Sequence, residues 1–224
     1  MSTVKGQRMG GSRHTGDFQE PKQLDKTSAY LIACYLSDGC IYHHKTDWAS
    51  FKMEVIDEDF AQKCQACINK LLDRNDDIRI AKSRTNPEKP TFIAYTGNQE
   101  MCRWLEDITG KKSYFPQEIY TAPKEIQMEL ISGLYDGEGW VGKIEHWNIG
   151  IASTSVWVLE LKDLLKQLGV NSANIFRRQN GGIKPLWAVN TSIREMKKAG
   201  FYFNIQRKQK RWEEYQVRSS ETKK

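Results

Sequence analysis

The chain has 224 residues, of which 39% are hydrophobic and 11% aromatic, enough to build one large domain or two small ones. Its longest apolar run, Ala29–Leu36, is far shorter than the ~20 residues that a membrane-spanning helix needs. Lys and Arg outnumber Asp and Glu by 34 to 28, a balance that suits a polyanionic partner without identifying one. Five cysteines, an odd number, favour reduced thiols and an intracellular protein.

The first segment, residues 1–27, is polar, rich in Gly and Ser, and lacks hydrophobic periodicity, so we predict a flexible tail. It contains Lys5, Arg8 and Arg13 ahead of its first acid, Asp17, and in this it faintly resembles an organellar transit segment. The acids from Asp17 onward weaken that interpretation. The compartment is therefore left open between the cytoplasm or nucleoid and an organelle matrix.

Two long segments then predict the same order of elements, each headed by an apolar run that we expect to be helical. The first segment predicts strands at 40–42 and 50–56, a helix at 59–72 capped by Asp59, strands at 78–84 and 91–96, and a helix at 99–108. The second predicts strands at 140–144 and 147–152, a helix at 155–168 between a Ser155 cap and a Gly169 stop, strands at 174–179 and 186–189, and a helix at 192–199.

Landmark residues recur between the two segments at a constant shift of 95. Lys89-Pro90 matches Lys184-Pro185, Phe92 matches Trp187, and Met101 matches Met196. An accidental likeness inside one domain is the alternative, but the ordered recurrence favours an internal duplication. The predicted fold is α+β, with pseudo-symmetric αββαββα units at 28–122 and 123–215 and tails at 1–27 and 216–224. Two packed helices would join the units, and four strands from each would form one saddle-shaped antiparallel sheet.

Each unit opens with a copy of one motif, residues 31–39 (LIACYLSDG) and 131–139 (ISGLYDGEG), in which an apolar run ends at an acid followed by glycine. The acids, Asp38 and Glu138, are 100 residues apart. A glycine just past a helix is usually left-handed, which would place each acid in the last helical turn. The helix dipole disfavours a carboxylate there by up to ~1 kcal/mol. The repeated misplacement indicates that positive charge lies between the two helix ends.

On these motifs and their spacing, the chain resembles a monomeric, two-motif LAGLIDADG homing endonuclease over residues 28–215. The second copy is close to the family pattern, whereas the first departs from it at Leu36, where aspartate is common, and at Cys34, where leucine is common. The resemblance implies a site-specific, Mg²⁺-dependent endonuclease that cuts both strands of a long DNA site across the minor groove and leaves 3′ overhangs. An intron RNA maturase or a DNA-binding protein without cleavage is the alternative on the same scaffold.

The motif helices have a predicted structural task, which is to join the two halves. Small residues let helix backbones approach closely, so we expect Ala33, Ser132 and Gly133 to lie at the helix interface. By resemblance, the first acid of the second motif, Asp136, has a structural role at the helix junction rather than a catalytic one.

Their second predicted task is to hold a divalent cation. Asp38 and Glu138 would be the metal ligands and catalytic acids, and the carbonyl groups of Ser37 and Gly137 would add further oxygen ligands. Hard oxygen ligands favour Mg²⁺, with Ca²⁺ or Mn²⁺ as substitutes in the site. Metals so held could activate water and stabilise the leaving oxygen in phosphodiester cleavage. The resemblance implies that each acid serves one DNA strand.

Each half also ends with a lysine four residues before an aromatic residue, Lys111 before Phe115 and Lys208 before Trp212. Such a lysine can stabilise developing charge or orient the attacking water. Because the family carries basic residues at comparable places, we predict that Lys111 and Lys208 are catalytic. A phosphate contact or an ordinary solvated lysine is the alternative. A shifted register would instead bring in Lys112, Arg207 or Lys210.

Strand alternation should place basic and polar side chains on the sheet face turned away from the helices, where double-stranded DNA would bind. The candidates are Lys45, Lys52, Arg79, Lys82 and Arg84 in the first half, and Lys143, Arg177, Arg178, Gln179 and Lys184 in the second. Any one of them is compatible with a solvated strand residue, so the set carries the prediction. Its unequal halves predict an asymmetric site bound by a monomer, with intron RNA as the alternative partner and no membrane.

Two further features have plainer interpretations. Cys64 and Cys67 have a metal or redox spacing, but no second pair accompanies them, and buried small hydrophobes are favoured. Glu54 lies where the family often has a polar residue near the metal, and its expected second-half counterpart is Gly150.

Overall fold

The computed structural model describes residues 18–45, 48–83, 86–142, 148–178 and 185–221. The first unit contains α1 (Lys26–Leu36), β1 (Gly39–His43), β2 (Ala49–Val55), α2 (Glu58–Leu72), β3 (Arg79–Lys82), β4 (Pro90–Thr96) and α3 (Gln99–Thr109). A 3₁₀ turn, η1 (Gln117–Tyr120), leads to α4 (Lys124–Glu138), β5 (Gly139–Val141), β6 (Asn148–Ser153), α5 (Trp157–Gln167), β7 (Asn174–Arg178), β8 (Leu186–Ser192) and α6 (Ile193–Ala199), and then to α7 (Gln206–Glu221). The α+β fold and the repeated order of elements are confirmed.

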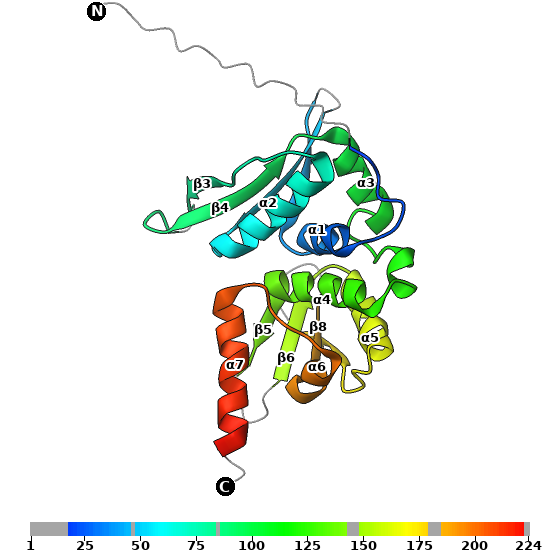
Figure 1. Cartoon of the computed structure of the whole chain (residues 1–224), viewed down its shortest axis with the longest axis vertical. Coiled ribbons are helices and arrows are strands. Elements are labelled where there is room, and N and C mark those ends of the chain that lie inside the picture. The colour runs from blue at the N-terminus through cyan, green and yellow to red at the C-terminus, as the bar shows by residue number, and fades with distance from the viewer. Residues whose placement is uncertain (1–17, 46–47, 84–85, 143–147, 179–184, 222–224) are drawn as a thin grey trace, which may run out of the picture.

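The strands form two separate antiparallel sheets rather than the single sheet predicted from the sequence. Their orders are β1-β2-β4-β3 and β5-β6-β8-β7, so each unit completes its own four-stranded sheet. Figure 1 shows α1 and α4 side by side at the middle of the molecule, with one sheet in each half. The halves are therefore joined through helices, because no strand pairing links the two sheets among the described residues.

The strand pairing follows the internal repeat in the two sheets. Phe92 lies opposite Val55 at the end of β2, and Trp187 lies opposite Ser153 at the end of β6. The two landmark methionines, Met101 and Met196, are both fully buried. The shift of 95 read from the sequence therefore holds in β4 and β8 and in the helices that follow them.

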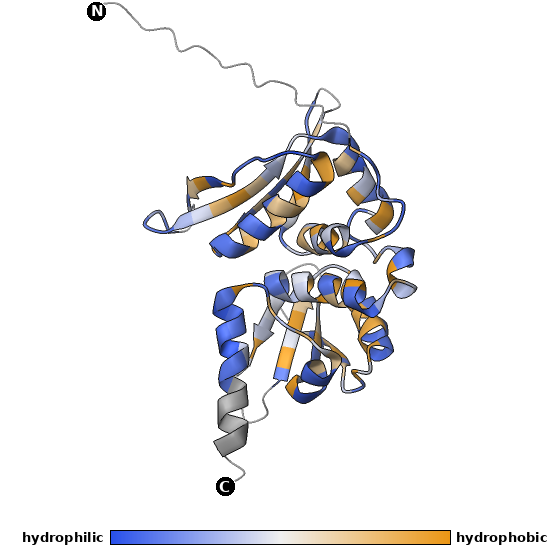
Figure 2. Ribbon diagram, in the orientation of Figure 1, coloured by the Kyte–Doolittle hydropathy of each residue, from blue (hydrophilic) through white to orange (hydrophobic). Residues whose placement is uncertain are grey.

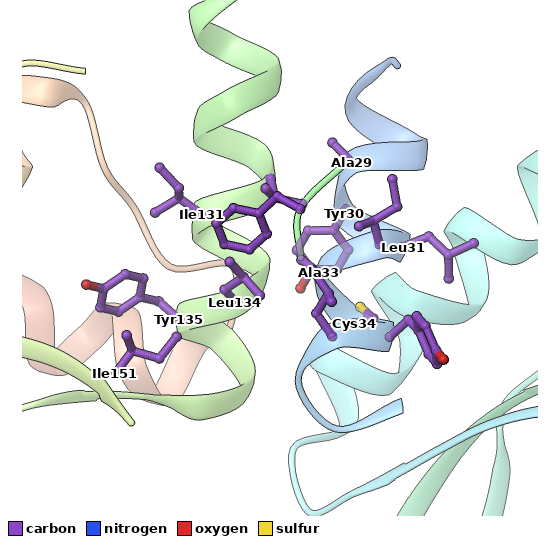
Figure 3. Close-up of a cluster of buried hydrophobic side chains, with 14 of the residues drawn as sticks. Ala29, Tyr30, Leu31, Ala33, Cys34, Ile131, Leu134, Tyr135 and Ile151 are labelled. Carbon is purple, nitrogen blue, oxygen red and sulfur yellow. The ribbon is translucent and has the colours of Figure 1, made fainter. Parts of the chain in front are cut away.

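Small residues bring the backbones of α1 and α4 close together. A Cβ built on Gly133 would lie 2.6 Å from the Cβ of Ala33 and 3.1 Å from the Tyr30 ring. No real side chain tolerates such distances, so glycine permits this approach. Figure 3 shows the seam: Leu31 and Cys34 of α1 point into one half and Tyr135 of α4 into the other.

The glycines after the motif acids are not left-handed, so the predicted helix stop is wrong. Gly139 has φ −82° and ψ 155°, and Gly39 already begins β1. Instead, a Cβ on Gly39 would lie 2.6 Å from the Phe51 ring, and one on Gly139 would lie 2.4 Å from the Tyr135 carbonyl oxygen. The chain passes directly from helix to strand there, and only glycine fits against the last turn.

The expected helix caps are also replaced. Asp57, not Asp59, precedes α2, and it makes no side-chain cap. Helix α5 starts after Val156 without a side-chain cap, so the Ser155 prediction is wrong. The stop at Gly169 is confirmed in conformation, with φ +83°.

Helix α7 was not predicted, because its basic sequence has no apolar stripe that would signal a helix. Figure 2 shows that its described residues are mostly hydrophilic, in contrast to the central strand β6. Its Trp212 is nevertheless buried against Phe201 and Phe203, with ring centroids 5.2 and 6.0 Å away. Among the described helices, none is long and apolar enough to cross a membrane.

Candidate active site at the paired helix ends

The two motif acids meet where α1 and α4 end together. A Cβ built on Gly137 would lie 2.6 Å from Asp38 Oδ2 and 2.5 Å from Ser37 Oγ. The Asp38 carboxylate therefore packs against the backbone of the residue that directly precedes Glu138. Glycine at 137 is required for this contact, because any side chain would displace the carboxylate.

The pKa values of both acids are raised by this environment. Burial raises the pKa of Glu138 to about 7, and the neighbouring Asp38 carboxylate adds to the increase. Burial also raises the pKa of Asp38, while Lys208 and Lys112 oppose that shift. The Asp38 side chain is exposed and Glu138 is half-buried, so water screens the charge of Asp38 more than that of Glu138. Two acids that repel one another in a partly dry site favour a bound cation.

A lysine ammonium group lies at the end of each motif helix. Lys208 Nζ donates to the carbonyl oxygens of Tyr135 (2.9 Å), Gly137 (3.0 Å) and Asp136. Lys112 Nζ donates to the Ser37 carbonyl oxygen at 3.1 Å. These ammonium groups supply the positive charge that the sequence predicted at the helix ends, so the helix-dipole argument alone does not require a metal.

The lysine of the first half at this site is Lys112 rather than the predicted Lys111. Gly110, Lys111 and Lys112 all have positive φ values, 52°, 54° and 71°. This bend turns the Lys111 side chain to an exposed position and brings Lys112 to the end of α1. Spacing to Phe115 could not reveal it, because a left-handed bend does not follow helical or strand periodicity.

Burial lowers the pKa of both site lysines. The pKa of Lys208 falls to about 8, although Asp136 and Asp38 favour its charged form. The pKa of Lys112 is also lowered, with Asp38 and Glu138 opposing the shift. Each ammonium group is thus electrostatically coupled to the motif acids.

The donor set fits a hard divalent cation. Asp38 and Glu138 offer carboxylate oxygens, and the Ser37 and Gly137 carbonyls, although bonded to lysines, each keep a second lone pair. In the described part of the chain, no group of three His, Cys, Asp or Glu side chains converges as a metal site. The remaining ligands would be water or phosphate oxygens, which is typical of Mg²⁺.

Asp136 is a buried structural acid rather than part of this site. Its carboxylate accepts hydrogen bonds from Tyr30 Oη (2.8 Å), from the Asn204 amide N–H (3.0 Å) and side chain (2.8 Å), and from the Ile205 N–H (3.3 Å). Burial raises its pKa to about 6, and these hydrogen bonds limit the increase. The carboxylate joins α1 of one half to the segment before α7 in the other.

The predicted DNA-contacting residues do not all share one face. Lys52 and Arg79 lie on strand positions whose side chains alternate away from the helix-covered core. Arg79 stacks over the Tyr95 ring at 4.1 Å, and Lys52 pairs with Glu54 at 2.6 Å. The structure therefore groups two of the predicted cations with an aromatic and an acid on the outer face of the first sheet.

Other predicted contacts are divided by strand register. Lys82 lies three residues after Arg79 on β3, so its side chain falls on the opposite face of the strand. Arg177 pairs with Trp187 and falls on the helix-covered face of the second sheet. The backbone of Arg178 pairs with that of Leu186 at the end of β7. Lys45 is exposed just after β1. Arg84, Lys143, Gln179 and Lys184 lie outside the described residues.

The outer face of the second half carries residues that the search for basic side chains missed. A Cβ built on Gly150 would lie 2.5 Å from both the Asn190 Oδ1 and the Trp140 ring, so these side chains cover that glycine. The two-residue alternation of the predicted strands was the available signal, because it places Trp140 and Asn190 on the same face as Gly150. Gly150 pairs with Trp140, as Lys52 pairs with Cys40, so Gly150 is the counterpart of Lys52 and not of Glu54 as predicted.

Glu54 and the two helical cysteines have local roles. Glu54 also accepts a hydrogen bond from Thr91 Oγ1 at 2.9 Å, within the outer face of the first sheet. Cys64 and Cys67 are buried in α2, where burial raises the pKa of Cys67 to about 12. An unreactive buried thiol agrees with the packing interpretation.

Comparison with solved structures places this architecture among known folds. Mesophilic variants of the homing endonuclease I-DmoI match with a TM-score of 0.57 and 21% identity, over 78% of this chain and 92% of theirs. I-DmoI in complex with DNA and Ca matches with a TM-score of 0.56 and 20% identity, over 77% and 86%. The homing endonuclease I-WcaI bound to its DNA recognition sequence matches with a TM-score of 0.58 and 12% identity, over 83% and 87%.

No protein-family model and no curated protein matches the sequence. At these identities the structural matches establish the fold. The chain has a two-unit, LAGLIDADG homing-endonuclease-like fold, as the sequence resemblance predicted.

Proposed function

We propose that the protein is a site-specific double-strand DNA endonuclease that acts as a monomer and depends on a divalent cation, Mg²⁺ in the first instance. The observation that carries the proposal is the meeting of Asp38 with the Gly137–Glu138 backbone at the joined ends of α1 and α4. One chain supplies both acids, so one chain can address both strands. Solved structures of this fold contain DNA with Ca or Mn, which supports a divalent-cation site.

In this proposal the two motif acids bind the cation and the two site lysines stabilise negative charge on the phosphates. When bound, the cation would polarise a phosphate oxygen and lower the pKa of an attacking water. Asp38 and Glu138 would hold the cation. Because both pKa values are raised, the two carboxyl groups would ionise more readily with the cation bound than without it. Lys112 and Lys208 would place positive charge beside the phosphates, where negative charge develops during cleavage.

DNA would lie across the outer faces of the two sheets, with cuts across the minor groove and 3′ overhangs. Lys52 and Arg79 would contact the first half-site. Trp140 and Asn190 would contact the second, where an amide can pair with an adenine edge. The chemical difference between the two faces predicts an asymmetric target.

A DNA-binding protein or intron RNA maturase that does not cleave is the second candidate. The observation in its favour is that Lys112 and Lys208 already offset the helix-end charge without a metal. Such a protein would bind its target yet leave it intact in Mg²⁺.

The test begins with selection of cleaved sequences from a randomised duplex library in Mg²⁺. Asp38→Asn and Glu138→Gln should then each lower double-strand cleavage by about 10³-fold or more, because a metal-binding carboxylate is lost. Affinity for the same duplex in Ca²⁺ should stay within a few-fold. Asp107→Asn, an exposed acid on α3, is the matched control and should cut normally. Full cleavage by either site variant would refute the proposal, and retention of DNA without scission by the wild type would favour the binder.

A further inference from the structure

Helix α7 carries Lys208 in its first turn, but its own sequence does not cap that turn. The residue before the helix is Ile205, whose side chain has no acceptor. The first amide of the helix, Gln206 N–H, instead donates to Asp59 Oδ2 at 2.7 Å. Asp59 lies on α2 in the other half of the protein. A carboxylate at a helix N-terminus satisfies a free donor and complements the helix dipole, so α7 is capped across the interface.

The next residue of α7 is held by the neighbouring acid. Arg207 donates from Nε to Asp57 Oδ1 at 2.9 Å and from an Nη to Asp57 Oδ2 at 2.8 Å. This two-bond pairing fixes the orientation of the guanidinium as well as its distance. Asp57 stands where α2 would be expected to have its own cap, yet it makes no side-chain cap there. Both acids at the start of α2 therefore serve α7.

Lys208 follows directly after these two anchored residues and reaches the end of α4. The corresponding lysine of the first half, Lys112, is held differently. It follows the left-handed bend after α3, where its backbone N–H donates to Thr109 Oγ1 at 3.4 Å, within its own half. The chain thus positions one lysine locally and the other through both halves.

From these contacts we propose that Asp57 and Asp59 are positioning residues: they fix the first turn of α7 so that Lys208 reaches the helix end beside Glu138. The second half of the active site is then incomplete without the first half, although each half has its own motif acid and its own sheet. The inference rests on the proposed nuclease function for its rate measurement, but not for its structural measurement.

The rate experiment follows each strand of a plasmid target separately. Lys208→Met is expected to slow one strand, and Lys112→Met the other. Asp59→Ala and Asp57→Ala should slow the same strand as Lys208→Met, by about 10- to 100-fold, so that nicked plasmid accumulates. Asp59→Asn keeps an oxygen acceptor and should restore most of the rate. A general loss of folding or binding would slow both strands equally, and that result would overturn the proposal.

Glu58→Ala is the matched control. Glu58 lies between the two acids and accepts a hydrogen bond from Gln62 on its own helix at 3.0 Å, so its removal should leave both strand rates unchanged. If Glu58→Ala slowed cleavage of one strand as strongly as Asp59→Ala does, the proposal would also be overturned.

Hydrogen exchange on the full chain without DNA or metal measures positioning directly. Asp59→Ala should speed exchange of the amides in the first turn of α7, and leave α1 and α4 as protected as in the wild type. Unchanged exchange in α7 would refute the positioning role even if the wild type cuts DNA. Faster exchange together with an inactive wild type would instead refute the nuclease function and leave the positioning contact established.

Discussion

The two motif-helix ends carry the same charges, one carboxylate and one ammonium group, but the chain delivers the ammonium group by different routes. At the end of α1 it comes from Lys112 on a left-handed bend. At the end of α4 it comes from Lys208 in the first turn of α7, a helix without a counterpart among the described residues of the first half. What the halves have in common at this site is therefore the arrangement of charge and not the path of the backbone.

The helix ends also differ two residues before each motif acid. The second motif has Asp136 at a position where the first motif has Leu36, and both are buried. Asp136 uses its carboxylate to hold the segment leading to α7, whereas Leu36 packs in the core. Helix α7 and the buried Asp136 thus belong to one hydrogen-bonded arrangement, which the described residues of the first half lack.

Replacing Asp136 by the residue of the other half should have the largest effect on stability. Asp136→Leu removes the acceptor of Tyr30, Asn204 and Ile205 and leaves buried donors unpaired. We expect a loss of about 3 to 5 kcal/mol in the free energy of unfolding, measured by urea denaturation. Tyr30→Phe removes one donor from the same network and should cost about 1 kcal/mol. Equal stability of Asp136→Leu and wild type would show that the network is dispensable.

Removing the two lysines tests whether the helix ends are chemically equivalent. Lys112→Met and Lys208→Met should each lower the cleavage rate of one strand by about 10- to 100-fold, since each removes a charge placed beside a phosphate. Lys111→Met, on the exposed neighbour of Lys112, should leave both strand rates near those of wild type. Strand-resolved cleavage measures all three variants, and a strong effect at Lys111 alone would reverse our assignment.

The raised pKa of Glu138 predicts that this residue lowers the free energy of unfolding by an amount that depends on pH. Its ordinary value is 4.5 and its folded value about 7, so the folded protein binds the extra proton between these pH values. Stability therefore falls as the pH rises through this window. Above pH 7, without metal, Glu138→Gln should be about 1 to 2 kcal/mol more stable than wild type, after allowance for the solvent-facing side of the site.

Thermal melting at pH 5 and pH 8 in EDTA measures this difference, which should be much smaller at the lower pH. Mg²⁺ should raise the melting temperature of the wild type and not that of Glu138→Gln, since the ion favours the ionised acid. A variant that gains nothing at pH 8 would contradict the electrostatic account of the site.

The smallest expected effects are on the salt dependence of DNA affinity, for substitutions on the two faces of β3. Arg79→Ala on the outer face of β3 should reduce the slope of log affinity against log salt by about 1, because one phosphate contact is lost. Lys82→Ala, on the opposite register of the same strand, should change the slope less. Equal slopes for the two variants would place the DNA on another surface.

Sequence patterns were reliable where a single period decides the outcome. Alternation and helical spacing located β2, β4 and α3 to within one or two residues, and the motif repeat predicted that α1 and α4 head equivalent units. They failed at α7, whose first amide donates to Asp59 of the other half and whose Trp212 is buried. They failed again at Lys111, because a run of positive φ values has no sequence period.

The sequence by itself determined the duplicated α+β architecture, the paired motif helices and the two acids near their ends. Each of these follows from local residue spacing and from a motif that recurs after 100 residues. The sequence also indicated Lys208, but only the tertiary structure decided that Lys112 is the lysine at the end of α1, which face each strand presents and which acids serve as caps. Those outcomes depend on backbone turns and on contacts between the two halves. Such contacts form only once the whole chain has folded, so no local pattern records them.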